Sequence, residues 1–202
     1  MYFLASRSPR RRQLLEQLGL DFEVLDVDIA EVRGAGEPVI DYVSRVAREK
    51  AGVGLLEVAA VAGAVVIGAD TEVELDGEVF GKPTDTEDAK RMLGLLGGRS
   101  HRVISVVWCV SAGCEDHAVS VSEVVFSAFE PAQIDAYVAT GEPFGKAGAY
   151  AIQGRAAAFV SHLSGSYSGV MGLPLHETSR LLRRFQPLSA VQDDLRALHG
   201  RV

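Results

Sequence analysis

Three arginines, Arg10, Arg11 and Arg12, directly follow a Ser-Pro pair near the start of the chain. Ser8 is a favoured N-cap and Pro9 a favoured first helical residue, so the arginines fall in the first turn of a helix. Cations are disfavoured at that end of a helix by up to about 1 kcal/mol each, whereas anions bind there. We therefore expect an anion such as phosphate to bind at this turn, with a solvated basic face as the alternative.

A carboxylate, Asp70, comes directly after residues 65–69, an apolar run typical of a buried strand. An acid at the end of such a strand can line a cleft, bind a metal or activate water, and we assign Asp70 such a role. Strand alternation places Glu72 and Glu74 on the same face as Asp70. For these two residues we favour exposure to solvent over a contribution to metal binding.

Two lysines complete the set of candidate phosphate-binding cations. Lys50 follows Val46 by four residues and Ala47 by three, on or beside the apolar stripe of an expected helix. It either contacts phosphate or extends past the stripe to water. Lys82 precedes Pro83 and lacks the glycine spacing and the Ser or Thr of a P-loop, so it offers phosphate only a point charge, or is an exposed hairpin lysine.

The composition and spacing of residues argue against several other kinds of site and partner. The chain has 20 Lys and Arg against 27 Asp and Glu, a net charge of −7 that argues against a broad nucleic-acid-binding face. The two cysteines, even with His117, offer zinc no fourth ligand at a suitable spacing, and no nucleophile triad can be assembled. No leader or long apolar run opens the sequence. We expect a cytoplasmic protein that binds neither nucleic acid nor membrane.

The rest of the sequence must position these side chains. Its 202 residues are 48% hydrophobic, which fits a single α/β domain over residues 1–202 with a tail from about residue 187. Apolar periods predict a helix after Ser8 and further helices over residues 38–62, 85–96, 131–139 and 173–185. They predict strands over residues 2–5, 22–25, 102–111, 118–129 and 158–163, and one from residue 65 into a hairpin turning at Asp76-Gly77, with a loop at 141–148 and a turn at 165–167.

Eight short strings stand in an order typical of one family. They are LASRSPRR from residue 4, REKA from 48, GADT from 68, GKP from 81, GEP from 141, KAGAYAIQG from 146, GSY from 165 and GLPL from 172. Together they resemble the Maf family of nucleoside triphosphate pyrophosphatases, over nearly everything before residue 186. The resemblance implies an α/β fold like that of inosine triphosphate pyrophosphatases, with an elongated mixed β-sheet flanked by helices and two lobes around a cleft. It also implies a homodimer.

The same resemblance implies an activity and roles for particular residues. The reaction is hydrolysis between the α and β phosphates of a nucleoside triphosphate, with Mg²⁺ or Mn²⁺. Phosphate binding is implied for Ser8, Arg10, Arg11, Lys50 and Lys82, and proton acceptance for Asp70. Glu31 matches an acidic position of the family near the metal, and Asp70 is implied as a second residue at the metal. Substrate choice is associated with Arg10, Thr71 and Gln153, as in the branch that acts on dTTP and UTP.

Three positions depart from the family pattern. Gly145 stands where Asp commonly precedes the Lys-Ala-Gly run, Glu72 replaces a usual apolar residue, and Gly169 occupies a position that is often Asn. Gly145 leaves it open whether that loop contributes a carboxylate to the metal.

The resemblance favours pyrimidine nucleotides as substrates and leaves several alternative functions open. A glutamine amide pairs with the uracil or thymine edge, so Gln153 favours dTTP, UTP and 5-modified uridine triphosphates over purines, unless it is a loop side chain facing water. The implied role is removal of non-standard or excess nucleotides, with an association to septum formation. The alternatives are a 7-methyl-GTP pyrophosphatase, a phosphohydrolase releasing orthophosphate, and a non-catalytic nucleotide-binding regulator of division. Asp70 speaks against the regulator, because a carboxylate among phosphate-binding cations weakens anion affinity.

Overall fold

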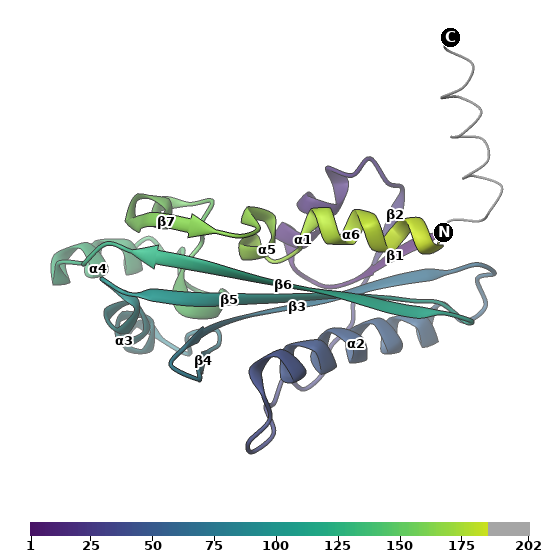
Figure 1. Cartoon of the computed structure of the whole chain (residues 1–202), viewed down its shortest axis with the longest axis horizontal. Coiled ribbons are helices and arrows are strands. Elements are labelled where there is room, and N and C mark those ends of the chain that lie inside the picture. The colour runs from purple at the N-terminus through teal and green to yellow at the C-terminus, as the bar shows by residue number, and fades with distance from the viewer. Residues whose placement is uncertain (186–202) are drawn as a thin grey trace, which may run out of the picture.

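A long mixed sheet with helices on both faces forms the fold (Figure 1). The structure is a computed structural model that describes residues 1–185, so the expected tail from about residue 187 lies outside the described residues. The strands are β1 (Tyr2–Ala5), β2 (Phe22–Leu25), β3 (Val65–Leu75), β4 (Glu78–Phe80), β5 (Ser100–Val110), β6 (Glu115–Phe126) and β7 (Val160–Ser164). The helices are α1 (Pro9–Glu16), α2 (Val39–Glu57), α3 (Thr86–Leu96), α4 (Pro131–Val138), α5 (Tyr167–Met171) and α6 (Leu175–Leu182), with 3₁₀ helices η1 (Ala147–Ala149), η2 (Arg155–Phe159) and η3 (Arg183–Phe185).

The sheet has the strand order β2-β1-β3-β5-β6-β7, and β4 pairs with the C-terminal end of β3. β1 is parallel to both β2 and β3, whereas the pairs β3–β5, β5–β6 and β6–β7 are antiparallel. This confirms the expected α/β class with an elongated mixed β-sheet flanked by helices. Among the described residues, no helix combines the length and apolarity needed to cross a membrane.

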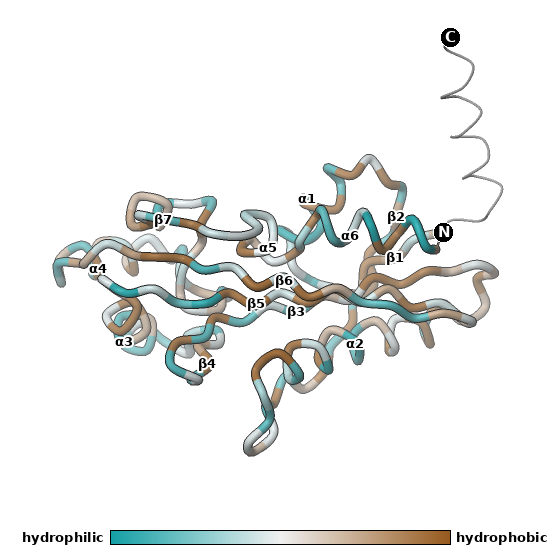
Figure 2. Tube along the Cα trace, in the orientation of Figure 1, coloured by the Kyte–Doolittle hydropathy of each residue, from teal (hydrophilic) through white to brown (hydrophobic). Residues whose placement is uncertain are grey.

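The helices divide the hydrophobic core into separate parts. α2 packs on β3 and β5, while α5 and α6 contact β5 and β6 from the opposite face (Figure 1). A further cluster lies at the far end of the sheet, where α3 and α4 pack together. Figure 2 shows hydrophobic residues gathered where β1 and β3 lie side by side and alternating with polar residues along β6. Residues 70–73 in the middle of β3 line a cavity.

Close packing of α2 on β3 depends on one glycine. A Cβ added at Gly68 would lie 2.3 Å from the backbone oxygen of Ala47 and 2.7 Å from the backbone nitrogen of Ala51, so no larger residue fits there. The buried stripe of α2 contains Ala47, Lys50 and Ala51, as the spacing predicts. The close contact therefore brings Lys50 over the strand just before Asp70.

Several element boundaries differ from those predicted. α2 ends at Glu57 instead of extending to about residue 62, and a short helix, α5, begins at Tyr167 where a turn is predicted. The last predicted helix begins at Leu175, because Pro174 has an extended backbone and acts as its N-cap. The predicted strand over 118–129 starts earlier and ends at Phe126. The positions of the main helices and strands along the chain are otherwise as predicted.

The prediction that Glu72 and Glu74 are exposed to solvent is wrong. Their exposed fractions are 8% and 9%, because β3 is an inner strand that is covered along its whole length. Glu74 accepts a hydrogen bond from the backbone N–H of Gly77 at 2.6 Å, which closes the hairpin turn, and it pairs with Arg102 at 3.3 Å. Glu72 points into the cavity described next.

Candidate active site

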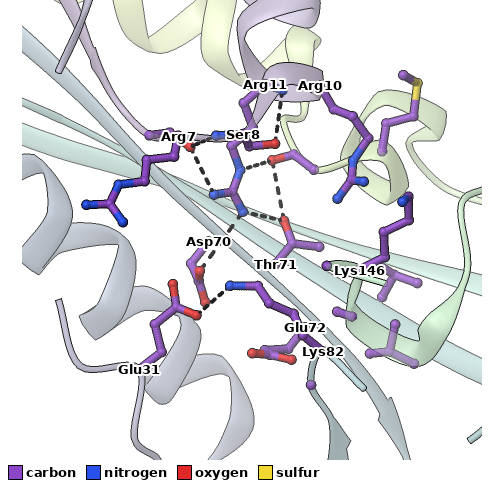
Figure 3. Close-up of a pocket in the computed structure, with 18 of the residues that line it drawn as sticks. Arg7, Ser8, Arg10, Arg11, Glu31, Asp70, Thr71, Glu72, Lys82 and Lys146 are labelled. Atoms are coloured by element: carbon purple, nitrogen blue, oxygen red, sulfur yellow. Dashed lines mark hydrogen bonds and ion pairs between the residues drawn. The ribbon is translucent and has the colours of Figure 1, made fainter. Parts of the chain in front are cut away.

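All the residues assigned to the site from the sequence line one cavity of about 890 Å³. They are Ser8, Arg10, Arg11, Glu31, Lys50, Asp70, Thr71, Lys82 and Gln153. Figure 3 shows most of them together with Arg7, Glu72 and Lys146, to which the sequence analysis assigned no part in the site. The structure therefore brings together cations and carboxylates from segments that are far apart in the chain.

Lys50 joins two carboxylates at the centre of the cavity. Its Nζ lies 2.7 Å from Oδ1 of Asp70 and 2.6 Å from Oε1 of Glu31. Lys50 is 7% exposed and Asp70 is 5% exposed, so this contact is shielded from water. A buried ammonium requires such partners, and the alternative in which Lys50 extends past the helix to water is therefore wrong.

Glu31 is held by two lysines at once. Its second oxygen, Oε2, accepts a hydrogen bond from Nζ of Lys82 at 2.9 Å. Burial raises the pKa of Glu31, but the ammonium groups of Lys50 and Lys82 outweigh it and lower the pKa to about 2. Glu31 is therefore ionised at neutral pH.

Arg11 is fixed at the junction of three elements. Its Nε donates to the backbone oxygen of Gly172 at 2.9 Å, and Nη2 donates to Oγ1 of Thr71 at 3.3 Å. Nη2 also lies 4.0 Å from Oδ1 of Asp70. The Ser8 hydroxyl caps α1 by accepting from the backbone N–H of Arg11 at 3.4 Å, as the sequence predicts. Arg11 thus presents a preorganised guanidinium beside the carboxylate.

Three cavity cations have no carboxylate within 4.0 Å in the described part of the chain: Arg33, whose guanidinium donates to backbone oxygens, and the pair Arg10 and Lys146, which lie on one side of the cavity (Figure 3). Nζ of Lys146 donates instead to the backbone oxygen of Phe144 at 3.2 Å. Burial and then the neighbouring positive charge lower the pKa of both residues, Arg11 acting on Arg10 and Arg10 acting on Lys146. Sequence reasoning assigned Lys146 no role, although its string KAGAYAIQG is among those shared with the family. This side of the cavity therefore carries two neighbouring positive charges that form no ion pair with a carboxylate of the described residues.

Two buried carboxylate oxygens of the cavity have no hydrogen-bond partner among the described residues: Oδ2 of Asp70 and Oε2 of Glu72. Burial raises the pKa of Glu72 to about 8, and the negative charges of Asp70 and Glu31 add to the effect. Asp70, Glu72 and Glu31 thus provide the cavity with carboxylate oxygens that can accept a proton or contact a cation. In the described part of the chain, no three His, Cys, Asp or Glu residues form a ready-made metal cluster.

We expect Glu72→Gln to stabilise the protein at alkaline pH and to have little effect at acid pH. The folded-state pKa of about 8 lies above the ordinary 4.5, so the folded state binds the extra proton between these values and loses stability as the pH rises through 8. Glutamine removes this loss, which is on the order of a few kcal/mol at pH 9. Melting temperatures of both proteins in chelator from pH 4 to 9 check this. An equal difference at all pH values would contradict it.

Thr71 and Gln153, two of the three residues associated with substrate choice, reach the cavity from different elements. Thr71 accepts from Arg11, and its Oγ1 lies 2.7 Å from Oγ of Ser105. Gln153 is exposed on a turn that follows η1 and lines the same cavity. Thr71 is thus fixed by hydrogen bonds, whereas Gln153 is placed by the backbone of its turn.

The fold and the cavity define an α/β protein equipped to bind a polyanion next to carboxylates. The chain matches the Maf family, described as Maf-like protein, over residues 2–185. It therefore belongs to the Maf family, as the resemblance of the eight strings predicts.

Relatives of known name align with most of this chain. A dTTP/UTP pyrophosphatase from Xanthomonas euvesicatoria is 56% identical over 187 residues, covering 92% of this chain and 98% of that protein. A nucleoside triphosphate pyrophosphatase from Xylella fastidiosa strain M23 is 55% identical, covering 92% of this chain and 99% of that protein. Among solved structures, the Staphylococcus aureus Ham1 protein is 16% identical with a TM-score of 0.42, over 62% of this chain and 71% of that one.

Proposed function

We propose that this protein hydrolyses dTTP and UTP, with modified pyrimidine nucleotides, to the nucleoside monophosphate and pyrophosphate. The observation that carries the proposal is the buried Lys50 shared by Asp70 and Glu31 in a cavity lined by further cations. The names of the relatives, dTTP/UTP pyrophosphatase and nucleoside triphosphate pyrophosphatase, support it. Cytoplasmic location and a homodimer remain predictions.

In the proposed reaction, the oxygen of water attacks the α-phosphorus and the bond from that phosphorus to the bridging oxygen breaks. Pyrophosphate leaves with the bond's electron pair, and the free oxygen of Asp70, Oδ2, takes the proton of the water. Lys50 and Arg11 hold the Asp70 carboxylate in place and balance charge on the phosphates. Positioning and charge stabilisation of this kind account for most of the rate in phosphoryl chemistry.

The carboxylates present fit a divalent cation, Mg²⁺ or Mn²⁺. Magnesium is commonly held by one or two carboxylates together with substrate phosphates, so a ready-made cluster of three ligands is not required. Asp70 offers an unpartnered buried oxygen, and Glu31 lies beside it across Lys50. Asp70 and Glu31 are the residues that would hold the ion. When bound, it would neutralise phosphate charge and polarise the phosphoryl oxygens.

Product analysis tests the proposal. The purified protein is incubated with dTTP, UTP, ATP, GTP and 7-methyl-GTP in Mg²⁺ or Mn²⁺, and the products are separated. We expect nucleoside monophosphate and pyrophosphate, with dTTP and UTP ahead of the purines. Orthophosphate as the first product would indicate a phosphohydrolase, and binding without turnover would indicate a regulator. Preference for 7-methyl-GTP would overturn the assigned substrate class.

We also expect Lys146→Ala to raise the KM for dTTP and UTP about tenfold, the scale of losing one charged hydrogen bond to phosphate. The melting temperature should stay the same or rise, because the lysine forms no ion pair with a carboxylate among residues 1–185 and lies close to Arg10. Lys90→Ala is the matched control, since Lys90 is on α3 and pairs with Asp135 outside the cavity. An unchanged KM for Lys146→Ala would remove this lysine from the binding site.

A further inference from the structure

Gln153 is presented to the cavity by a tight turn. The turn is closed by the backbone N–H of Gly154, which donates to the oxygen of Ala151 at 2.9 Å. Ala151 and Ile152 are both 5% exposed, whereas Gln153 is exposed and has no side-chain hydrogen bond among the described residues. The backbone conformation of the turn therefore determines the position of the Gln153 side-chain amide.

Glu142 binds the end of this turn from outside the cavity. Its Oε2 accepts from the backbone N–H of Arg155 at 3.1 Å, and its Oε1 accepts from that of Ala156 at 3.5 Å. A Cβ added at Gly154 would lie only 2.3 Å from Oε1 of Glu142, so a larger residue there would displace the carboxylate from its present position. Burial raises the pKa of Glu142, but these hydrogen bonds outweigh it and lower the pKa, so the carboxylate is an acceptor.

Tyr137 connects Glu142 to the start of the same turn. Its hydroxyl donates to Oε1 of Glu142 at 2.8 Å and accepts from the backbone N–H of Ala151 at 3.2 Å. The ring is 3% exposed and packs edge-on against Phe159. One phenol and one carboxylate thus bind the backbone on both sides of Gln153.

We propose that Tyr137 and Glu142 are positioning residues that set base selectivity by holding the turn that carries Gln153. Neither residue lines the cavity, so both act through the turn instead of touching the nucleotide. The inference rests on the proposed function, because it assumes that Gln153 reads the base. A buried backbone N–H left without its acceptor is costly, and loss of either partner should let the turn move.

Tyr137→Phe tests the inference, because it removes the hydroxyl and keeps the packed ring. We expect the ratio of kcat/KM for UTP to that for ATP to fall about tenfold, the scale of one misplaced hydrogen bond. Gln153→Ala should lower the same ratio. In the Gln153→Ala background, Tyr137→Phe should add less than about a twofold change, because coupled residues are non-additive. A role in stability alone would not produce this coupling.

Hydrogen exchange gives a readout that does not depend on turnover. Exchange at the backbone amides of Ala151, Arg155 and Ala156 should be faster in Tyr137→Phe and in Glu142→Gln, which provides a second variant if the first fails to fold. Tyr2→Phe is the matched control, since Tyr2 lies on β1 away from the cavity.

The failures of the two proposals can be told apart. A parent that prefers UTP, combined with an unchanged ratio in Tyr137→Phe and Glu142→Gln, would overturn only the positioning role. Additive effects of Tyr137→Phe and Gln153→Ala would also overturn it. A parent that hydrolyses no pyrimidine triphosphate would overturn the proposed function, and the selectivity role with it.

Discussion

Asp70→Asn is expected to lower kcat for dTTP and UTP about a hundredfold or more, the scale of losing a general base. The amide keeps the shape of the side chain but cannot accept the proton of the attacking water at Oδ2, the oxygen that has no partner in the described structure. The fold should persist, because Lys50 retains its contact with Glu31 at 2.6 Å. Release of pyrophosphate under saturating substrate measures the effect.

Asp76→Asn is the matched control for this substitution. Asp76 lies in the exposed turn between β3 and β4 with a φ of 54°, a conformation that asparagine tolerates well. Its partner Arg99 is outside the cavity, so turnover should equal that of the parent. Full turnover by Asp70→Asn, or by the parent in chelator, would contradict the proposed mechanism.

The sequence was sufficient to predict the elements that present the site. The apolar run before Asp70 and the spacing around Lys50 have the periods of a buried strand and of a helix stripe, and both are local properties. The Ser-Pro pair likewise predicts the start of α1, since capping depends on neighbouring residues.

Burial of the other acids could not be predicted in the same way. Glu72 has the polar character of an exposed position in an alternating strand, yet it is buried beside the cavity because other elements cover β3 on both faces. The pairing of Lys50 with Glu31 joins α2 to a segment without regular structure, and no periodicity encodes such a contact. The contacts of Tyr137 and Glu142 with the turn could not be predicted either, because they are made to backbone amides, which every sequence has.

Of the variants discussed, Lys50→Met should lose the most stability, about 3 to 5 kcal/mol at neutral pH, because it leaves the buried carboxylate of Asp70 without its ammonium partner and removes one partner of Glu31. The loss should shrink in acid. The pKa of Glu31, about 2 in the folded parent, lies below the ordinary 4.5, so its stabilising contribution is present above pH 4.5 and disappears as the pH falls towards 2. Urea unfolding of parent and variant from pH 3 to 7 measures this trend.

The double variant Lys50→Met with Asp70→Asn separates charge from packing. Removing the Asp70 charge as well leaves only the carboxylate of Glu31, which is still compensated by its contact with Lys82. The double variant should therefore recover part of the lost stability, while activity stays at or below that of Asp70→Asn. If it were as unstable as the sum of the two single variants, Lys50 would act through the packing of its aliphatic chain on α2. Recovery of stability would show that the ammonium group of Lys50 offsets the charge of the buried Asp70 carboxylate.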